Sequence, residues 1–187
     1  FIPNEKSPFA DLFDVSSSGS LILLKDSVAE YEEPKQYWGN AGAGVIAMAQ
    51  DTGRLLLSLR SPYVDQPGTW GAVGGAVDLS DSTMREAAVR EFEEETGYSG
   101  PIRLVPLFLY KSEDRAFQYQ NFLGVVPKEF EPTPDWETER FEWVRIRDLK
   151  KLQPKHFGLI ALVENRQSQV IITKEHGRLK YLENGYV

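Results

Sequence analysis

Short apolar runs, each about as long as a strand and separated by polar turn-forming residues, occupy most of the chain. Two of these runs, residues 44–50 and 54–60, flank Asp51-Thr52-Gly53, and Asp and Gly in so short a gap predict a hairpin turn. Residues 61–69 are rich in turn formers, and 127–136 form an acidic segment interrupted by prolines, so both are expected to be loops. The other predicted strands are residues 20–25, 104–110, 116–126 and 141–146.

A helix is predicted over residues 83–96, where apolar side chains recur at helical spacing and fall on one face. Thr83 with Glu86 matches a capping box at its start, and Gly97 is a typical residue just past a helix end. A second helix is expected over 157–165, and two short apolar runs, 170–173 and 179–182, predict a late hairpin.

This succession of elements, with many strands and two helices, predicts an α/β or α+β sandwich around a mixed sheet. The length of 187 residues suits one domain with a core of its own. We therefore expect residues 41–187 to form the main body of the domain. Residues 1–40 are expected to add an N-terminal arm and a first strand to that same domain.

Composition narrows the class of protein. The chain has no cysteine, which excludes a disulfide scaffold, a thiolate metal site and a cysteine nucleophile. The net charge of −7 argues against a binder of duplex nucleic acid, which needs a basic face. No apolar run is long enough to span a bilayer and no signal-peptide pattern stands at the start, so a cytoplasmic location without membrane contact is expected.

The negative charge is concentrated in two short stretches. Residues 86–95 hold five Glu and one Arg, and residues 129–142 hold six acids and one Arg, which leaves the rest of the chain slightly basic. Within the first stretch, Glu91 is three residues from Glu94 and four from Glu95, so their carboxylates share one side of the predicted helix. Like charges at this spacing destabilise a helix, and a hard divalent cation such as Mg²⁺, or alternatively Mn²⁺, would offset the repulsion.

The segment before this helix contains Gly74-Gly75, whose missing side chains let backbone approach a ligand closely. From here the sequence resembles the Nudix family. Residues 90–98 read Arg-Glu-Phe-Glu-Glu-Glu-Thr-Gly-Tyr and match the second half of the Nudix box, which as a whole spans residues 75–98. In the first half, Asp81 stands where the family has Glu, and eight residues instead of seven separate it from Arg90, which is a one-residue insertion.

The resemblance implies an α/β/α sandwich around a mixed sheet and metal-dependent hydrolysis of a diphosphate linkage in a nucleoside diphosphate derivative. It implies a small-molecule nucleotide as partner and allows a homodimer. By position in the box, Arg90 would hold a neighbouring carboxylate, and the acceptor of the water proton would be a box Glu (Glu91 or Glu94) or Glu137 in the second acidic stretch. The metal ligands implied by the box are Glu91, Glu94, Glu95 and the carbonyl of Gly74.

Substrate contacts are harder to assign from sequence. ADP-ribose or another nucleotide sugar is slightly preferred, a nucleoside triphosphate is the alternative substrate, and a non-catalytic nucleotide sensor is the alternative function. His156 and His176 have no ligand spacing and are expected to be structural or on the surface, while Trp70 and Phe117 are expected in the core. The candidate substrate-binding residues are Arg60, Trp38, Tyr63, Lys111 and Arg115, for phosphate or for stacking on a base.

Overall fold

The computed structural model describes residues 14–15, 21–22 and 41–183. Two short paired strands, β1 (Asp14–Val15) and β2 (Leu21–Ile22), are the described part of the N-terminal arm. The strand predicted over 20–25 is thus described only at β2. Trp38 lies outside the described residues, so the prediction that it binds substrate is not tested.

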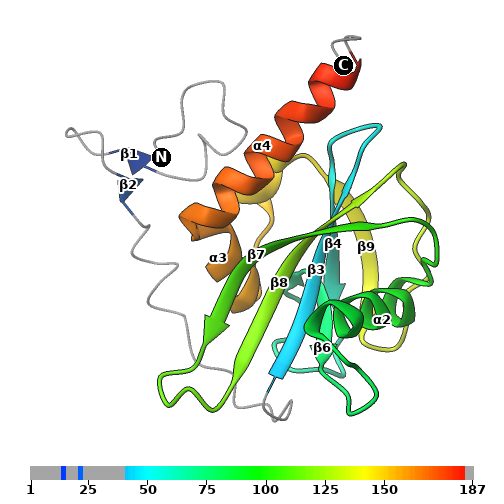
Figure 1. The fold of residues 1–187 in the computed structure, drawn as a ribbon, viewed down its shortest axis with the longest axis vertical. Helices are drawn as coiled ribbons and strands as arrows, with labels where there is room; N and C mark the ends of the chain where they lie inside the picture. Colours follow the sequence, from blue (N-terminus) through cyan, green and yellow to red (C-terminus); the bar gives the residue numbers. More distant parts are fainter. Residues whose placement is uncertain (1–13, 16–20, 23–40, 184–187) are drawn as a thin grey trace.

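Seven strands of the described chain form one mixed sheet (Figure 1). Its backbone order is β5-β4-β3-β8-β7, with β6 also paired to β3 and β9 to β4. β3 and β8 run parallel, whereas the other pairs are antiparallel. The strands are β3 (Ala41–Ala49), β4 (Leu55–Arg60), β5 (Trp70–Gly71), β6 (Val73–Ala76), β7 (Arg103–Lys111), β8 (Gln118–Val126) and β9 (Thr138–Val144).

The turn between β3 and β4 is the predicted hairpin. Gly53 has φ of 71°, in the left-handed region that favours glycine, and its N–H donates to the carbonyl of Ala49 at 2.8 Å. The antiparallel register pairs Ala47 with Leu56 and Met48 with Leu55. The Asp-Thr-Gly segment therefore reverses the chain as its composition predicted.

Helix α2 (Met84–Thr96) confirms the predicted central helix and its caps. The hydroxyl of Thr83 accepts from the N–H of Glu86 at 3.1 Å, and the Glu86 carboxylate accepts from the N–H of Ser82 at 2.7 Å. Gly97 ends the helix with φ of 74°. These contacts satisfy backbone groups that a helix terminus leaves open, so the position of α2 along the chain is fixed at both ends.

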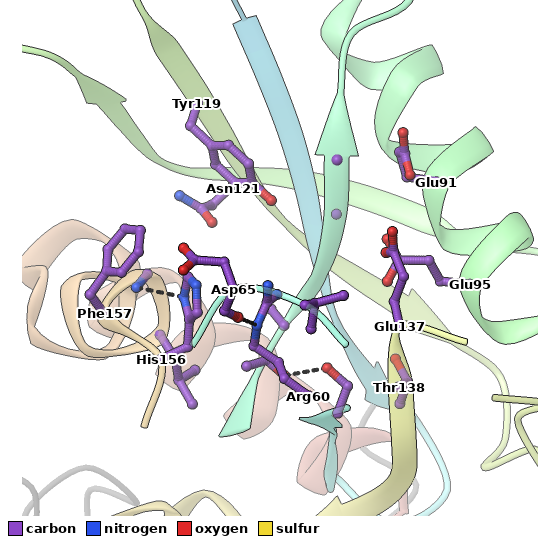
Figure 2. Close-up of a pocket in the computed structure, with 18 of the residues that line it drawn as sticks. Arg60, Asp65, Glu91, Glu95, Tyr119, Asn121, Glu137, Thr138, His156 and Phe157 are labelled. Atoms are coloured by element: carbon purple, nitrogen blue, oxygen red, sulfur yellow. Dashed lines mark hydrogen bonds between the residues drawn. The ribbon is translucent and has the colours of Figure 1, made fainter. Parts of the chain in front are cut away.

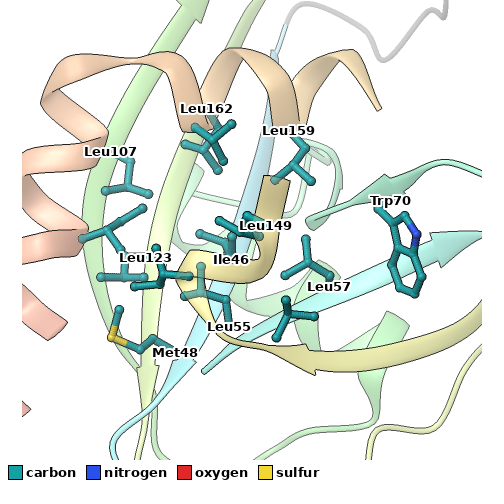
Figure 3. Packing of buried hydrophobic residues seen from close by; sticks show 14 of the residues in the cluster. Ile46, Met48, Leu55, Leu57, Trp70, Leu107, Leu123, Leu149, Leu159 and Leu162 are labelled. Atoms are coloured by element: carbon teal, nitrogen blue, oxygen red, sulfur yellow. The ribbon is translucent and has the colours of Figure 1, made fainter. Parts of the chain in front are cut away.

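Two hydrophobic clusters cover the two faces of the sheet, which makes the fold an α/β/α sandwich as expected. β3 shows why: Ile46 and Met48 point to one cluster while Val45 and Ala47 point to the other, as strand alternation requires. Figure 3 shows the larger cluster, where the sheet packs against the 3-10 helix η2 (Ile146–Lys151) and α3 (Phe157–Glu164). The smaller cluster lies under α2.

The predicted late hairpin is wrong, because residues 166–183 form one helix, α4 (Arg166–Glu183). The β-branched run of residues 170–172 favours a strand by local propensity, but Ile172 and Leu179 lie two helical turns apart and both enter the larger cluster. Asn165 precedes α4, and its side-chain oxygen accepts from the N–H of Ser168 at 2.9 Å. Among the described helices, none is both long enough and apolar enough to cross a membrane.

Candidate functional site

A cavity of about 400 Å³ opens between the sheet, the N-terminal part of α3 and the face of α2 that carries acidic residues. Figure 2 shows that its lining side chains fall into two groups. Glu91, Glu95 and Glu137 lie at one end, and Asn121, His156 and Phe157 at the other, with Arg60 between them. The cavity therefore has an acidic end and a polar aromatic end.

The acidic end is built by one turn of α2 and by the segment before β9. Glu91 and Glu95 are four residues apart, so they lie on the same face of the helix and both reach the cavity. Glu137 precedes Thr138, the first residue of β9, and its N–H is held by the Asp135 carboxylate at 2.9 Å. The structure thus brings together two residues of the first acidic stretch and one of the second.

Burial and mutual repulsion make these carboxylates hard to ionise together. Burial first, and then the charges of Glu137 and Glu91, raise the pKa of Glu95 to about 9, although the N–H of Gly74 donates to its carboxylate. Burial is also the largest cause that raises the pKa values of Glu91 and Glu137. A cation in this end of the cavity would stabilise all three ionised carboxylates at once.

The donor atoms at the acidic end fit a hard divalent cation. Glu95 Oε1 is buried without a hydrogen-bond partner, which is a costly state that a bound cation would relieve. The C=O of Gly74 points to the same side of β6 as its N–H, which donates to Glu95. In the part of the chain that the structure describes, no three acidic or imidazole groups are close enough to hold a metal as they stand. The carboxylates would therefore have to move together on binding.

Gly75 makes room for the Glu91 carboxylate. A Cβ on Gly75 would lie 2.5 Å from Cδ of Glu91 and 2.6 Å from both carboxylate oxygens, far inside normal contact distance. The side chain of Glu91 therefore rests directly on the backbone of β6. The Gly74-Gly75 pair was predicted to allow close approach of a ligand, and here Gly75 allows close approach of the Glu91 carboxylate to the backbone.

Arg90 binds three carboxylates on the outer side of this turn. Its Nη2 is 2.8 Å from Asp81 Oδ2 and donates to the carbonyl of Ala76 at 2.9 Å, and its Nη1 is 3.0 Å from Glu91 Oε1. The hydrogen bond from Arg90 is also the main cause that lowers the pKa of Asp81. Glu94 is exposed outside the cavity, 3.3 Å from Nη1 of Arg90. The extra residue in the box thus leaves Asp81 in contact with Arg90.

Two of the predicted substrate-binding residues line the cavity and two do not. Arg60 and Tyr63 line the cavity, and burial lowers the pKa of Arg60 although acidic groups nearby oppose this. Lys111 and Arg115 lie exposed at the end of β7 and in the turn after it, away from the cavity lining, so the structure does not support their assignment. The turn places them there, because Ser112 and Phe117 close it with a backbone hydrogen bond of 3.0 Å.

Tyr119 lies across the floor of the cavity in a slot made by three glycines. A Cβ on Gly42 would lie 2.7 Å from Cδ2 of the Tyr119 ring, and a Cβ on Gly44 or Gly74 would collide with its hydroxyl. Burial raises the pKa of Tyr119, and the charges of Glu95 and Glu91 raise it further. The phenol is therefore placed beside the acidic end, and it stays protonated.

The polar aromatic end contains residues that sequence reasoning missed. His156 caps α3, and its Nδ1 accepts from the N–H of Gly158 at 3.0 Å. It lines the cavity, so the expectation of a merely structural or surface histidine is incomplete. Phe117 lines the cavity and is only half-buried, contrary to its predicted place in the core, whereas Trp70 is buried as predicted. In the sequence, only the alternation of Phe117, Tyr119 and Asn121, just before and at the start of β8, indicated that these side chains share one side of a strand.

His156 makes the stability of the fold depend on pH. Burial and the nearby Arg60 lower the pKa of His156 to about 3, below the ordinary value of about 6.5 that applies to the unfolded chain. Between pH 3 and pH 6.5 the unfolded chain binds a proton at His156 and the folded chain does not. The contribution of neutral His156 to the free energy of unfolding is therefore fully present above about pH 6.5 and falls as the pH falls. His156→Asn keeps a capping acceptor but does not titrate. From pH 7 to pH 5 the free energy of unfolding of the wild type should therefore fall by about 2 kcal/mol relative to that of the variant.

Urea denaturation of both proteins at the two pH values measures this difference, in which the titration of all other groups cancels. A difference that stays constant between pH 7 and pH 5 would contradict the buried, neutral state of His156.

Comparisons with known proteins agree with this architecture. The NUDIX domain family matches residues 39–163. A putative 8-oxo-dGTP diphosphatase 3 of Mycobacterium tuberculosis is 32% identical over 134 residues, which are 67% of this chain and 61% of that protein. A putative nudix hydrolase 1 of Caenorhabditis elegans is 28% identical over 137 residues, 72% of this chain and 36% of that protein. The chain thus spans less than two thirds of either curated relative.

Among solved structures, the Nudix hydrolase RenU from M. smegmatis has a similar fold. The TM-score is 0.56 at 21% identity, with 94% of this chain and 96% of that chain covered. At this identity the likeness concerns the arrangement of helices and strands alone.

Proposed function

The chain belongs to the Nudix family, and from this premise we propose that it is an enzyme that hydrolyses a diphosphate linkage in a nucleoside diphosphate derivative. The observation that carries the proposal is the acidic end of the cavity. There Glu91 and Glu95 of α2 converge with Glu137 beside the close-approaching backbone of Gly74 and Gly75. An all-oxygen donor set near the half-buried Arg60 suits the neutralisation of a diphosphate.

Glu91, Glu95 and the carbonyl of Gly74 would hold the divalent cation, with Mg²⁺ preferred and Mn²⁺ as the alternative. When bound, such an ion supplies Lewis acidity and neutralises the charge of the diphosphate. Glu94 lies outside the cavity, so it is the weakest of the box candidates for a ligand. Arg90 would act as a positioning residue, since its contacts fix Glu91 and Asp81 relative to each other.

Glu137 is the preferred acceptor for the proton of the attacking water. It lines the cavity from the side opposite α2, and burial raises its pKa, which makes its carboxylate a stronger base. Arg60, between the acidic end and the polar aromatic end, would donate hydrogen bonds to the phosphate groups.

For the substrate, nucleotide sugars such as ADP-ribose and nucleoside triphosphates are the two candidate classes. The cavity has room for a nucleoside beyond the acidic end, which suits both. The 32% identical relative is named a putative 8-oxo-dGTP diphosphatase, and this supports the triphosphate class. The alternative of a non-catalytic nucleotide sensor requires that the carboxylates bind an ion or nucleotide without turnover. A homodimer remains part of the proposal by analogy to the family alone.

The proposal is tested by incubating the purified chain with Mg²⁺ or Mn²⁺ and a panel of ADP-ribose, GDP-mannose, dGTP, 8-oxo-dGTP, CTP and diadenosine tetraphosphate. Release of a nucleoside monophosphate that stops on addition of EDTA is the expected result. If nothing in the panel is cleaved while a nucleotide still binds, the sensor function replaces the proposed one.

A further inference from the structure

The polar aromatic end of the cavity presents a specific set of hydrogen-bonding groups. Asp65, Asn121 and His156 all line it, and they come from the loop after β4, from β8 and from the start of α3. Figure 2 shows the side chains of Asp65, Asn121 and His156 on the side of the cavity away from Glu91 and Glu95. Three elements far apart in the sequence thus meet at one place that the proposed chemistry does not use.

His156 contributes a hydrogen-bond donor. Its Nδ1 accepts the N–H of Gly158 at 3.0 Å, so in the neutral ring the hydrogen is on Nε2. The capping role of His156 at α3 holds the ring in this orientation. The neighbouring N–H, that of Phe157, donates to Gln66 Oε1 at 3.3 Å, which ties the loop after β4 to the same helix start.

Asn121 and Asp65 contribute acceptors. The Nδ2 of Asn121 donates to the carbonyl of Phe108 at 3.0 Å, which fixes the amide orientation and leaves Oδ1 as an acceptor. Asp65 is held in place by its backbone, because its carbonyl accepts from Nε of Arg60 at 2.7 Å. Its carboxylate is an acceptor with two oxygens. The end therefore offers two acceptor groups and one donor.

An aromatic wall beside these groups suits a flat ring. Tyr119 and Asn121 share one face of β8, and Phe117 directly precedes the strand. Phe108 and Tyr110 stand on the neighbouring strand β7. Ring centroids along this wall are 6.3 to 6.5 Å apart. Aromatic side chains of this kind stack on nucleobases with little regard for base identity, so identity must be read by the polar groups.

We propose that Asp65, Asn121 and His156 bind the nucleobase of the substrate and select guanine. Guanine presents two adjacent donors, N1–H and the N2 amino group, beside the acceptor O6, which complements two acceptors and one donor. Adenine presents a ring acceptor, N1, where guanine has a donor, and this lone pair would face a carboxylate. The inference rests on the proposed function and extends it to a guanine nucleotide, as either a triphosphate or a nucleotide sugar.

Calorimetric binding of GMP, IMP and AMP to the full chain with Mg²⁺ tests the base selection separately from catalysis. IMP keeps N1–H and O6 but lacks the N2 amino group. We expect GMP to bind about 10-fold or more tightly than AMP, with IMP between them. Asp65→Asn should weaken GMP binding about 10-fold and leave AMP binding within about twofold. Glu113→Gln, an exposed acid outside the cavity, is the matched control and should change neither.

AMP binding as tight as GMP binding, or equal effects of the Asp65 and Glu113 substitutions, would overturn the inference. Where monophosphates bind too weakly to measure, the ratio of kcat/KM for dGTP over dATP decides in the same way. Cleavage that prefers adenine nucleotides would reject guanine selection and keep the proposed hydrolase. A preference for GMP in a protein that cleaves nothing would keep the base selection and reject the hydrolase.

Discussion

Glu95→Gln is expected to keep the fold and to lower Mg²⁺-dependent hydrolysis at least about 100-fold. Groups that only support a metal ligand typically cost about 10- to 100-fold when replaced, so the loss of a ligand should reach at least the upper value. The fold should persist because the amide has the shape of the carboxyl group, and because Glu95 Oε1 has no hydrogen-bond partner to lose. The effect should appear in kcat, measured by release of nucleoside monophosphate.

Glu93→Gln is the matched control, since Glu93 lies on the exposed side of the same helix. Thermal unfolding with EDTA and with Mg²⁺ gives a second readout: the stabilisation by Mg²⁺ expected for wild type and Glu93→Gln should be absent in Glu95→Gln. An active Glu95→Gln protein that Mg²⁺ still stabilises would remove Glu95 from the site.

Gly75→Ala should lower kcat about 100-fold without unfolding the protein. The added Cβ would collide with the Glu91 carboxylate at 2.5 Å, and that carboxylate, at the end of a flexible side chain, can move away more easily than backbone can. A displacement of about 1 Å in a reacting geometry is enough for a loss of this size. Steady-state kinetics measures the loss, and the unfolding temperature checks the fold.

Gly177→Ala serves as the control for the added methyl group, because nothing lies within 4 Å of its Cβ position on α4. It should leave activity unchanged and stabilise the helix slightly, since alanine is favoured over glycine there by about 1 kcal/mol. Full activity of Gly75→Ala would show that Glu91 does not need its place against β6.

The acidic helix illustrates what periodicity can and cannot predict. Helical spacing correctly grouped Glu91, Glu94 and Glu95 on one side of α2. From Glu91, however, Glu94 is rotated about 60° one way and Glu95 about 40° the other, and the sequence does not say on which side the cavity lies. The structure puts Glu95 in the cavity and Glu94 outside it, against Arg90.

Sequence patterns did not predict the features of the structure that depend on packing between segments distant along the chain. The run Val170 to Ile172 has the local preference of a strand, yet burial of Ile172 in the larger cluster favours a helix. Lys111 and Arg115 are basic residues near the box in sequence; they are exposed at the β7–β8 turn and are not among the residues that line the cavity, so their role in substrate binding stays a prediction. The polar aromatic end joins the loop after β4, β8 and α3, and no short-range pattern predicts that these three segments line one cavity.

The slot around Tyr119 restricts how this sequence can diverge. Gly42, Gly44 and Gly74 stand on two paired strands, and each would collide with the tyrosine if it gained a side chain. At Gly42 the nearest other atom to the added Cβ would be the carbonyl oxygen of Gly75 at 3.1 Å, so a substitution there becomes tolerable once a smaller residue replaces Tyr119. At Gly44 and Gly74 the added Cβ would also lie within 2.9 Å of backbone atoms, so these two positions stay restricted whatever residue stands at 119. Among homologues, a larger residue at 42 should therefore accompany a smaller one at 119, while positions 44 and 74 should remain glycine in either case.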